Sequence, residues 1–209
     1  MTIAGLGFVA IWNDVAPGAE EDFIAWHRQE HMPERLSIPG FLSGQRWNNE
    51  RAKPRFFTLY VLENADVAAS PAYIDRLNAP TPWTRRVMAS YRNNARCVGS
   101  FPVGRGEAPG RHVAVGRFVD RPEDAAGIAD RLMALEGVTG CHIGISDSNT
   151  SALATAERAG RTVAEPAGLV IVCLDSESAE IVIHIEACLK RAGASEPAMM
   201  TLALSHPAP

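Results

Sequence analysis

The sequence predicts an α+β protein built from two consecutive copies of one β-α-β-β-α-β unit. Apolar runs without helical spacing alternate with runs that have helical apolar spacing, and this order occurs twice. A segment with three glycines and one proline, 104–110, separates the two series and reads as a linker. Short echoes recur in the same order in both halves: IPGFLSG and LEGVTGC, LYVLEN and IVCLDS, GSFPV and LSHPA. Together these observations favour a tandem duplication.

The first half opens with an almost wholly apolar run, 5–13, which we interpret as a strand. A helix over 17–31 is expected next, because Pro17 and several acids occupy its first turn and apolar residues follow. Pro33 is expected to end this helix, since proline lacks the N–H that a helix interior needs. A second strand is predicted over 41–49.

A third strand is predicted over 55–64, which is rich in aromatic and β-branched residues. A broken helical region follows over 70–78 and 81–92, where Thr81 before a proline is typical of an N-cap. Strand 95–103 closes the first half. The elements expected in the second half are strand 112–120, helix 121–137, strand 138–146, a partly helical polar segment 147–166, strand 168–175, helix 176–193 and strand 197–207.

Each half is therefore expected to be a ferredoxin-like unit, with an antiparallel four-stranded sheet that carries both helices on one face. Strands 5–13 and 168–175 lack clean apolar and polar alternation, which predicts that both faces of each sheet are buried. Two sheets packed face to face would satisfy this need, with repeats at 1–104 and 111–209. The alternative is two independent domains on a linker. A homodimer is a further assembly that the sequence allows.

Composition argues against several classes of partner. The net charge is −4 without a lysine-rich run, so nucleic acid is a poor partner. The longest apolar runs, such as 168–174, are far shorter than the roughly 20 residues that cross a bilayer. We also expect no signal peptide, since no basic leader precedes the first strand. The four cysteines form no C-x-x-C pair, which predicts a reducing cytoplasm.

Residues 27–31 spell H-x-x-E-H, a pattern that also occurs on zinc peptidase helices. At about 100° per residue, His27, Glu30 and His31 share the apolar side of the helix with Phe23. Burying such polar groups without partners costs a few kcal/mol each, so their position needs an explanation.

Three explanations compete. A zinc site would use both histidines as ligands and Glu30 as base, but the nearest downstream acid for a third ligand, Glu107, lies in the linker; we therefore expect no metal. The second reading is a structural histidine hydrogen-bonded to Glu30 or Glu34. The third is a small-molecule pocket, in which a histidine with a reference pKa near 6.5 exchanges protons at neutral pH.

The repeat provides an internal control. In each half we compare the length of chain between the apolar stripe of the first helix and the glycine before the second strand. This interval runs from Phe23 to Gly40 in the first half but only from Ile128 to Gly137 in the second. About eight additional residues, which include both histidines, are thus confined to the first half. Packing alone would need only the shorter version, so the insertion favours a site in the first half.

One stretch of the first half resembles the EthD-like branch of the dimeric α/β-barrel superfamily, through an aromatic helix, an H-x-P turn, a P-G strand start and an R-W pair. The matching residues are Phe23, Trp26, His31, Pro33, Pro39, Gly40, Phe41, Arg46 and Trp47. The resemblance implies two ferredoxin-like sheets closed into a barrel, with a cavity between sheet and helices. It also implies cofactor-independent isomerases, cyclases, decarboxylating enzymes or oxygenases, or auxiliaries of degradative pathways, which act on small molecules.

The leading functional hypothesis is a cofactor-independent enzyme, of isomerase, cyclase or degradative-pathway type, acting on a small aromatic or unsaturated carboxylate. The residues assigned to it are His31 as acid/base, His27 and Glu30 as orienting groups, Trp26, Trp47 and Trp83 as pocket walls, and Arg46 as the anion contact. The rival hypothesis is a non-catalytic small-molecule-binding or assembly module whose histidine is structural.

Overall fold

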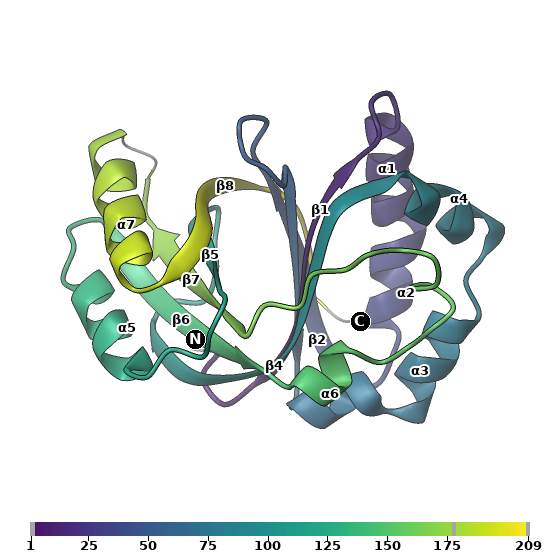
Figure 1. Ribbon diagram of the computed structural model, residues 1–209, viewed down its shortest axis with the longest axis horizontal. Coiled ribbons are helices and arrows are strands. Elements are labelled where there is room, and N and C mark those ends of the chain that lie inside the picture. Colours follow the sequence, from purple (N-terminus) through teal and green to yellow (C-terminus); the bar gives the residue numbers. More distant parts are fainter. Residues whose placement is uncertain (1–2, 177–178, 208–209) are drawn as a thin grey trace.

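The computed structural model describes residues 3–176 and 179–207 (Figure 1). Within them, eight strands form one closed antiparallel barrel in the order β1-β3-β2-β8-β5-β7-β6-β4. The strands are β1 (Gly7–Val15), β2 (Phe41–Asn48), β3 (Phe56–Leu62), β4 (Tyr91–Gly106), β5 (His112–Phe118), β6 (Val138–Ser146), β7 (Gly168–Leu174) and β8 (Ala194–Pro207). The predicted α+β class is confirmed.

The two halves contribute equivalent parts of this barrel. The strand order is β4-β1-β3-β2 in the first half and β8-β5-β7-β6 in the second. The halves hydrogen-bond to each other along two seams, between β2 and β8 and between β4 and β6. The expectation that the sheets form a barrel-like architecture is confirmed, and the hydrogen-bonded edges exclude two independent domains on a linker.

Apolar side chains from both halves fill the barrel interior. Phe8, Trp12 and Phe57 of the first half share one core cluster with Val115 and Ile171 of the second. Every residue of β7 is buried, and in β1 all are buried except the half-buried Ile11 and Asp14, which confirms that these two strands are covered on both faces. Every residue of β3 is buried as well. Much of the space inside the barrel is thus filled by a packed apolar core.

Two helical layers cover the outside of the barrel on opposite sides (Figure 1). The first-half layer consists of α1 (Glu20–Trp26), the π-helical turn η1 (His27–His31), α2 (Met32–Leu36), the 3-10 turn η2 (Ala65–Ala69), α3 (Pro71–Asn78) and α4 (Pro82–Ser90). The second-half layer consists of α5 (Ala125–Met133) and α7 (Ala179–Arg191), while α6 (Ser148–Ser151) starts a long connection to β7. The helix predicted over 176–193 corresponds to α7, and residues 177–178 of its predicted first turn lie outside the described range. No helix of the described chain is both long and apolar enough to cross a membrane.

The helix at the H-x-x-E-H motif does not end before Pro33, contrary to the prediction. The backbone widens into a π-helical turn, in which the Met32 N–H donates to the His27 carbonyl, and α2 then continues to Leu36. Pro33 lies in the first turn of α2, where a missing N–H disturbs least. The wider turn thus carries the chain past the proline without a break.

The segment 104–110 is also more ordered than a linker. Its first three residues extend β4 and pair with β6, so that Gly104 lies opposite His142. Gly106 adopts φ +66°, and a Cβ there would lie 2.1 Å from the Thr139 carbonyl oxygen. Glycine is needed at this position because β4 must approach β6 closely to close the barrel. By contrast, the strand predicted over 138–146 and the Thr81 cap are confirmed.

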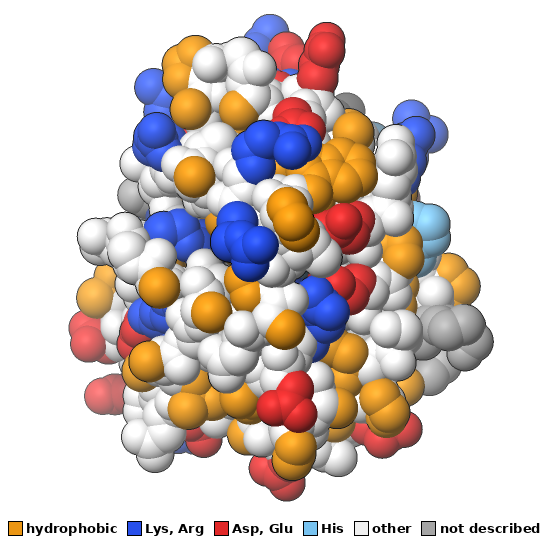
Figure 2. Space-filling view, turned by 90° about the vertical axis from the view of Figure 1, so that its right-hand side faces the viewer, with side chains coloured by type: hydrophobic (Ala, Val, Ile, Leu, Met, Phe, Trp, Pro, Cys, Tyr) orange, Lys and Arg blue, Asp and Glu red, His pale blue; other side chains and the backbone are white. Residues whose placement is uncertain are grey.

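The outer face of the first-half helices mixes both signs of charge (Figure 2). Arg86 pairs with Asp22 at 3.0 Å, and Arg76 pairs with Glu34 at 2.9 Å. Such a face offers no single-sign patch of the kind that binds a nucleic-acid backbone.

Candidate functional site

A cavity of about 70 Å3 lies against the outer face of the first-half sheet. The turn η1 and the helices α3 and α4 form part of its wall, and a polar stretch of the second half, residues 152–166, closes it. We call this stretch the cover segment. The cavity is lined by Ile11, His27, His31, Arg35, Thr58, Tyr60, Tyr73, Leu77, Met88, Tyr91, Asn94, Arg96, Leu153, Thr155, Glu157, Arg158, Arg161 and Val163.

The cover segment is docked on the first half by backbone hydrogen bonds. The Arg96 N–H donates to the Ala164 carbonyl at 2.9 Å, and the Ala164 N–H donates to the Asn94 carbonyl at 2.9 Å. Near its other end, the Glu157 N–H donates to the Leu77 carbonyl at 3.1 Å. Figure 1 shows the green stretch after α6 crossing to the side that carries α2, α3 and α4 before it returns to β7. The cavity is therefore built by both halves of the chain.

The π-helical turn places two histidines in the cavity wall. The side chains of His27 and His31 are 2% and 7% exposed, and their ring centroids lie 5.5 Å apart. The Nδ1 atoms of both rings are buried and have no hydrogen-bond partner in the described chain. Single π-helical turns recur at functional sites because they change the direction of side chains within a helix. The predicted sharing of one buried helix face by both histidines is confirmed.

Burial lowers the pKa of both histidines well below its usual value, since the charged imidazolium loses its hydration. Nearby cations act in the same direction: Arg46 next lowers the pKa of His27, and Arg35 next lowers that of His31. Both rings are therefore neutral at pH 7. A neutral imidazole offers one nitrogen as proton acceptor and one N–H as donor.

The chain contains three tyrosines, and all of them line the cavity. The hydroxyl of Tyr60 is buried without a hydrogen-bond partner among the described residues. Burial raises the pKa of Tyr60 and of Tyr91 above the usual value, so both hydroxyls keep their protons at neutral pH. Tyr60 can thus donate a hydrogen bond to a ligand in the cavity.

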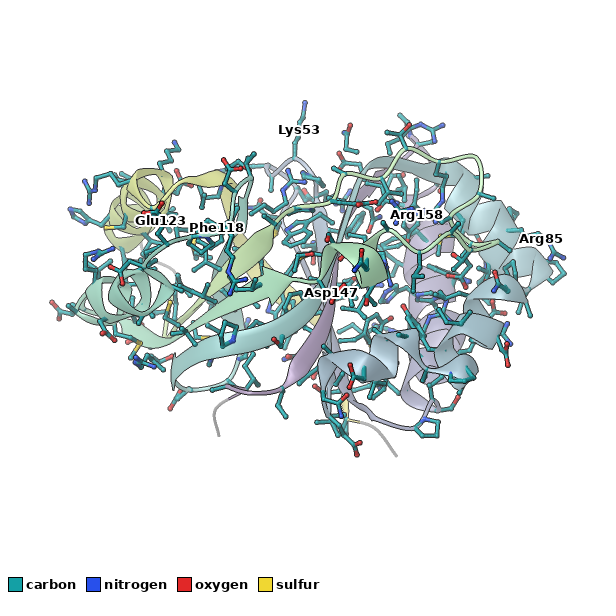
Figure 3. All side chains as sticks on the ribbon, turned by 60° about the horizontal axis from the view of Figure 1, so that its bottom comes forward. Lys53, Arg85, Phe118, Glu123, Asp147 and Arg158 are labelled. Atoms are coloured by element: carbon teal, nitrogen blue, oxygen red, sulfur yellow. The ribbon has the colours of Figure 1, made fainter. Side chains whose placement is uncertain are left out.

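Arginines give the cavity wall a positive charge. Arg35 is buried between two carboxylates, Glu34 at 3.0 Å and Glu157 at a short distance, and this ion pair anchors the cover segment. Arg158, labelled on the cover segment in Figure 3, pairs with Glu165. Two further arginines of the lining, Arg96 on β4 and Arg161 on the cover segment, form no ion pair with a carboxylate in the described chain. Glu157 is the acidic residue of the lining.

In the described chain, Glu30 does not hydrogen-bond to the histidines that it was expected to orient. Its Oε1 accepts hydrogen bonds from the Thr81 hydroxyl at 2.6 Å, the Thr84 hydroxyl at 3.1 Å and Trp26 Nε1 at 3.2 Å. The carboxylate therefore ties the π-helical turn to the first turn of α4. The structure gives it a bracing position, which a helical wheel cannot distinguish from a catalytic one.

The tryptophans do not form the pocket walls as expected. Trp26 stacks on His31, with ring centroids 4.2 Å apart, and supports it from outside the cavity lining. Trp47 lies in the barrel core and donates to the Gly110 carbonyl at 2.9 Å. Trp83 donates to Asp22 at 2.9 Å near the helix surface. Aromatic content alone did not identify which rings face the cavity.

Arg46, the expected anion contact, is buried beneath the helix and not in the cavity lining. Its guanidinium lies 5.5 Å from the centroid of the Phe23 ring, and the side chain is 2% exposed. Its Nε and Nη1 have no hydrogen-bond partner in the described chain. Burial lowers the pKa of Arg46 to about 10, which leaves it protonated at neutral pH. Its charge acts on His27 from below the helix.

The zinc set suggested by the motif is not assembled around both histidines. The ligand atoms of His31, Glu34 and Glu157 lie within 4.8 Å of one another, but Arg35 is hydrogen-bonded to both carboxylates. A guanidinium at this position repels a divalent cation and already neutralises its ligands. Glu107, the remaining candidate ligand, lies elsewhere, and its carbonyl bonds His142 Nε2 at 2.6 Å.

No protein-family profile and no curated protein matches the sequence. Solved structures do match. An anthrone oxidase-like protein is 10% identical, with a TM-score of 0.59 over 100% of this chain and 97% of that chain. A putative chlorite dismutase is 9% identical, with a TM-score of 0.55 over 96% of both chains. A mutant chlorite dismutase from Candidatus Nitrospira defluvii is 8% identical, with a TM-score of 0.51 over 96% of this chain and 92% of that chain.

At such low identities the likeness establishes the fold and no shared activity. The shared α+β fold is, in this chain, one closed eight-stranded antiparallel barrel with helices on its outside.

Proposed function

We propose that this chain is a cofactor-independent enzyme that transfers a proton within a small aromatic or unsaturated carboxylate, with His31 as the acid/base. The chain would be a tandem duplication related to the EthD-like branch, with repeats at 1–104 and 111–209. The identical strand order of the two halves supports the duplication. The cytoplasmic location and a homodimer remain predictions.

The observation that carries the proposal is the state of the two histidines. Polar groups buried without partners destabilise a fold, so each one needs an explanation, such as a catalytic role or a bound molecule that completes the hydrogen bonding. Here the Nδ1 atoms of His27 and His31 and the nearby Tyr60 hydroxyl lack partners among the described residues, and all three side chains line one cavity. A purely structural histidine would be expected to bond a neighbouring group.

The neutral state of His31 suits it to act first as a base. It would take a proton from the carbon next to the unsaturated bond of the substrate, while the electron pair of that C–H bond shifts into the conjugated system. The resulting imidazolium would then return the proton to a different carbon. Such an isomerisation conserves all atoms and electrons, so it needs no oxidant, reductant or second substrate.

The transient negative charge of this reaction would be stabilised by the surroundings. The lining arginines provide positive potential, and the Tyr60 hydroxyl provides a hydrogen-bond donor. The name of the anthrone oxidase-like neighbour also favours an aromatic ligand. A cavity of about 70 Å3, however, has room for only the reacting end of such a molecule.

Deuterium exchange tests the proposal without knowledge of the natural substrate. Vinylacetate and styrylacetate would be incubated with the protein in D2O, and the loss of the proton next to the carboxylate would be followed by NMR. We expect the wild type to accelerate exchange of at least one acid, and His31→Gln to slow it about 100-fold or more. His184→Gln is the matched control, since His184 is exposed on α7.

Equal exchange in the wild type and His31→Gln would contradict the proposal. Binding of the acids without any exchange would favour the rival hypothesis, a non-catalytic binding module.

A further inference from the structure

We infer that Arg161, which the second half contributes through the cover segment, binds the carboxylate of the ligand in the first-half cavity. This inference rests on the proposed function and names the residue that would select its substrate class. It replaces the expectation that Arg46 makes this contact.

Four arginines face the cavity. The four lining arginines fall into two groups, because Arg35 and Arg158 each have a carboxylate partner. Arg96 donates instead to the backbone carbonyl of Ser151 at 3.1 Å, and Arg161 donates to the backbone carbonyl of Glu157. Within the described chain no carboxylate pairs with either of these two. The lining thus keeps two positive charges that a bound anion could neutralise.

Arg161 is the better placed of these two arginines. Its guanidinium carbon lies 5.4 Å from the centroid of the Tyr91 ring, and its Nε is buried without a hydrogen-bond partner in the described chain. Burial lowers the pKa of Arg161, and its charge in turn helps to lower the pKa of His31. The Glu157 carboxylate also acts on Arg161 and raises its pKa, but it forms no ion pair with Arg161 in the described chain. A desolvated cation without a directly paired carboxylate destabilises the free protein, and a ligand carboxylate would supply both the ion pair and the missing acceptor.

The position of Arg161 also determines which end of the ligand would face His31. Arg161 and Tyr91 line the inner cavity and, on their other side, an outer hollow of about 660 Å3 between α4 and the cover segment. Met88, Asn94 and Glu157 also line both spaces, so these five residues form the boundary between them. A ligand with its unsaturated end at His31 would place its carboxylate at this boundary, where Arg161 can reach it from the cover segment.

The test compares a carboxylate with its neutral isostere. The dissociation constants of benzoate and benzamide would be measured by isothermal titration calorimetry for the wild type, Arg161→Met, Arg161→Lys and Arg121→Met. Arg121 is an exposed arginine of the second half and serves as the control. We expect the wild type to prefer benzoate by about tenfold or more, as befits a charge-assisted hydrogen bond.

Arg161→Met should abolish this preference while benzamide binds as before, Arg161→Lys should restore part of it, and Arg121→Met should leave it intact. If the methionine variant does not fold, Arg161→Gln provides the same comparison.

A wild type without the preference, or a preference that survives Arg161→Met, would overturn the assignment. The result is separable from that of the proposed function. If Arg161→Met loses the preference for benzoate while His31→Gln exchanges deuterium as fast as the wild type, the anion site stands and the catalytic role of His31 is refuted.

Discussion

The two halves arrange their strands in the same order but fill the space beneath their helices differently. In the second half, Ile128 and Leu132 of α5 and Ile185 and Leu189 of α7 pack directly on the sheet and form an apolar core. In the first half, the corresponding layer contains buried histidines, an arginine and tyrosines around a cavity. The first-half helices also pack apolar side chains on their sheet, such as Phe23 and Leu36, but this layer has a polar-lined cavity beside those clusters. The difference teaches that a helical layer can pack on this barrel and still leave room for a polar cavity.

The largest loss of stability is expected from a substitution in the apolar core of the second-half layer. Leu132 is 1% exposed, so Leu132→Ala should lower the free energy of unfolding by about 2–5 kcal/mol, through lost burial and a residual cavity. Chemical denaturation measures this change, and Ile183→Ala on the exposed side of α7 should change it by less than about 0.5 kcal/mol. Benzoate affinity should be unchanged in both variants. A loss of affinity in Leu132→Ala would show that the second layer is not merely a scaffold.

The first-half histidines should make stability depend on pH. Their folded-state pKa values are lowered, so the unfolded chain binds more protons below its histidine pKa near 6.5. Stability should therefore be fully present above pH 6.5 and should fall as the pH decreases toward the folded-state values. Between pH 6.5 and 5.5 each histidine should contribute a loss of about 1 kcal/mol.

Denaturation curves at several pH values for the wild type and for the double variant His27→Gln, His31→Gln would measure this contribution. The double variant should show a shallower pH dependence, whereas His184→Gln should match the wild type. Identical slopes in all three proteins would contradict the neutral buried state of the two rings.

The cover segment should loosen when its buried ion pair is cut. Glu157→Gln leaves Arg35 with Glu34 as its remaining partner, so we expect a loss of about 1–2 kcal/mol in unfolding free energy. Amide hydrogen exchange should become faster at 152–166, while it stays unchanged in α5. Glu165→Gln is a useful comparison because its ion pair with Arg158 is more exposed. Unchanged protection of the cover segment in Glu157→Gln would refute the anchoring role of this pair.

The smallest change in stability is expected at Tyr60. Its hydroxyl has no partner in the described chain, so Tyr60→Phe should alter the free energy of unfolding by less than about 0.5 kcal/mol. If the hydroxyl serves the ligand, the deuterium exchange rate should nevertheless fall. Tyr73→Phe tests the specificity of this effect on the same cavity wall. A variant Tyr60→Phe with unaltered exchange would remove Tyr60 from the site.

The residue pattern predicted most of the strands because their signal is local. The run 168–174 is apolar throughout and forms β7. The Thr81 side chain accepts a hydrogen bond from the Thr84 N–H, as expected for the N-cap that the following proline indicates. The confinement of the histidine-bearing insertion to the first half also pointed to the layer that contains the cavity. These features depend on neighbours within a few positions of the chain.

The remaining features depend on contacts between distant segments. Nothing near Pro33 in the sequence indicates a π-helical turn, which depends on how the helix packs on the sheet. The cover segment is a polar stretch whose partners lie far away in the sequence. Arg35, for example, is 122 residues from its partner Glu157. Arg161 was therefore missed, and Trp47 and Arg46 were assigned to the pocket although the pleat turns the former into the barrel and the latter beneath Phe23.

The central claim is that a small carboxylate binds in the first-half layer and not in the second. The most direct test is a titration with benzoate, followed through the imidazole nitrogen signals of the protein by NMR. The account predicts saturable shifts of the His27 and His31 signals and no shift of the His184 signal. Unperturbed signals of His27 and His31 at saturating benzoate, or shifts confined to His184, would contradict it.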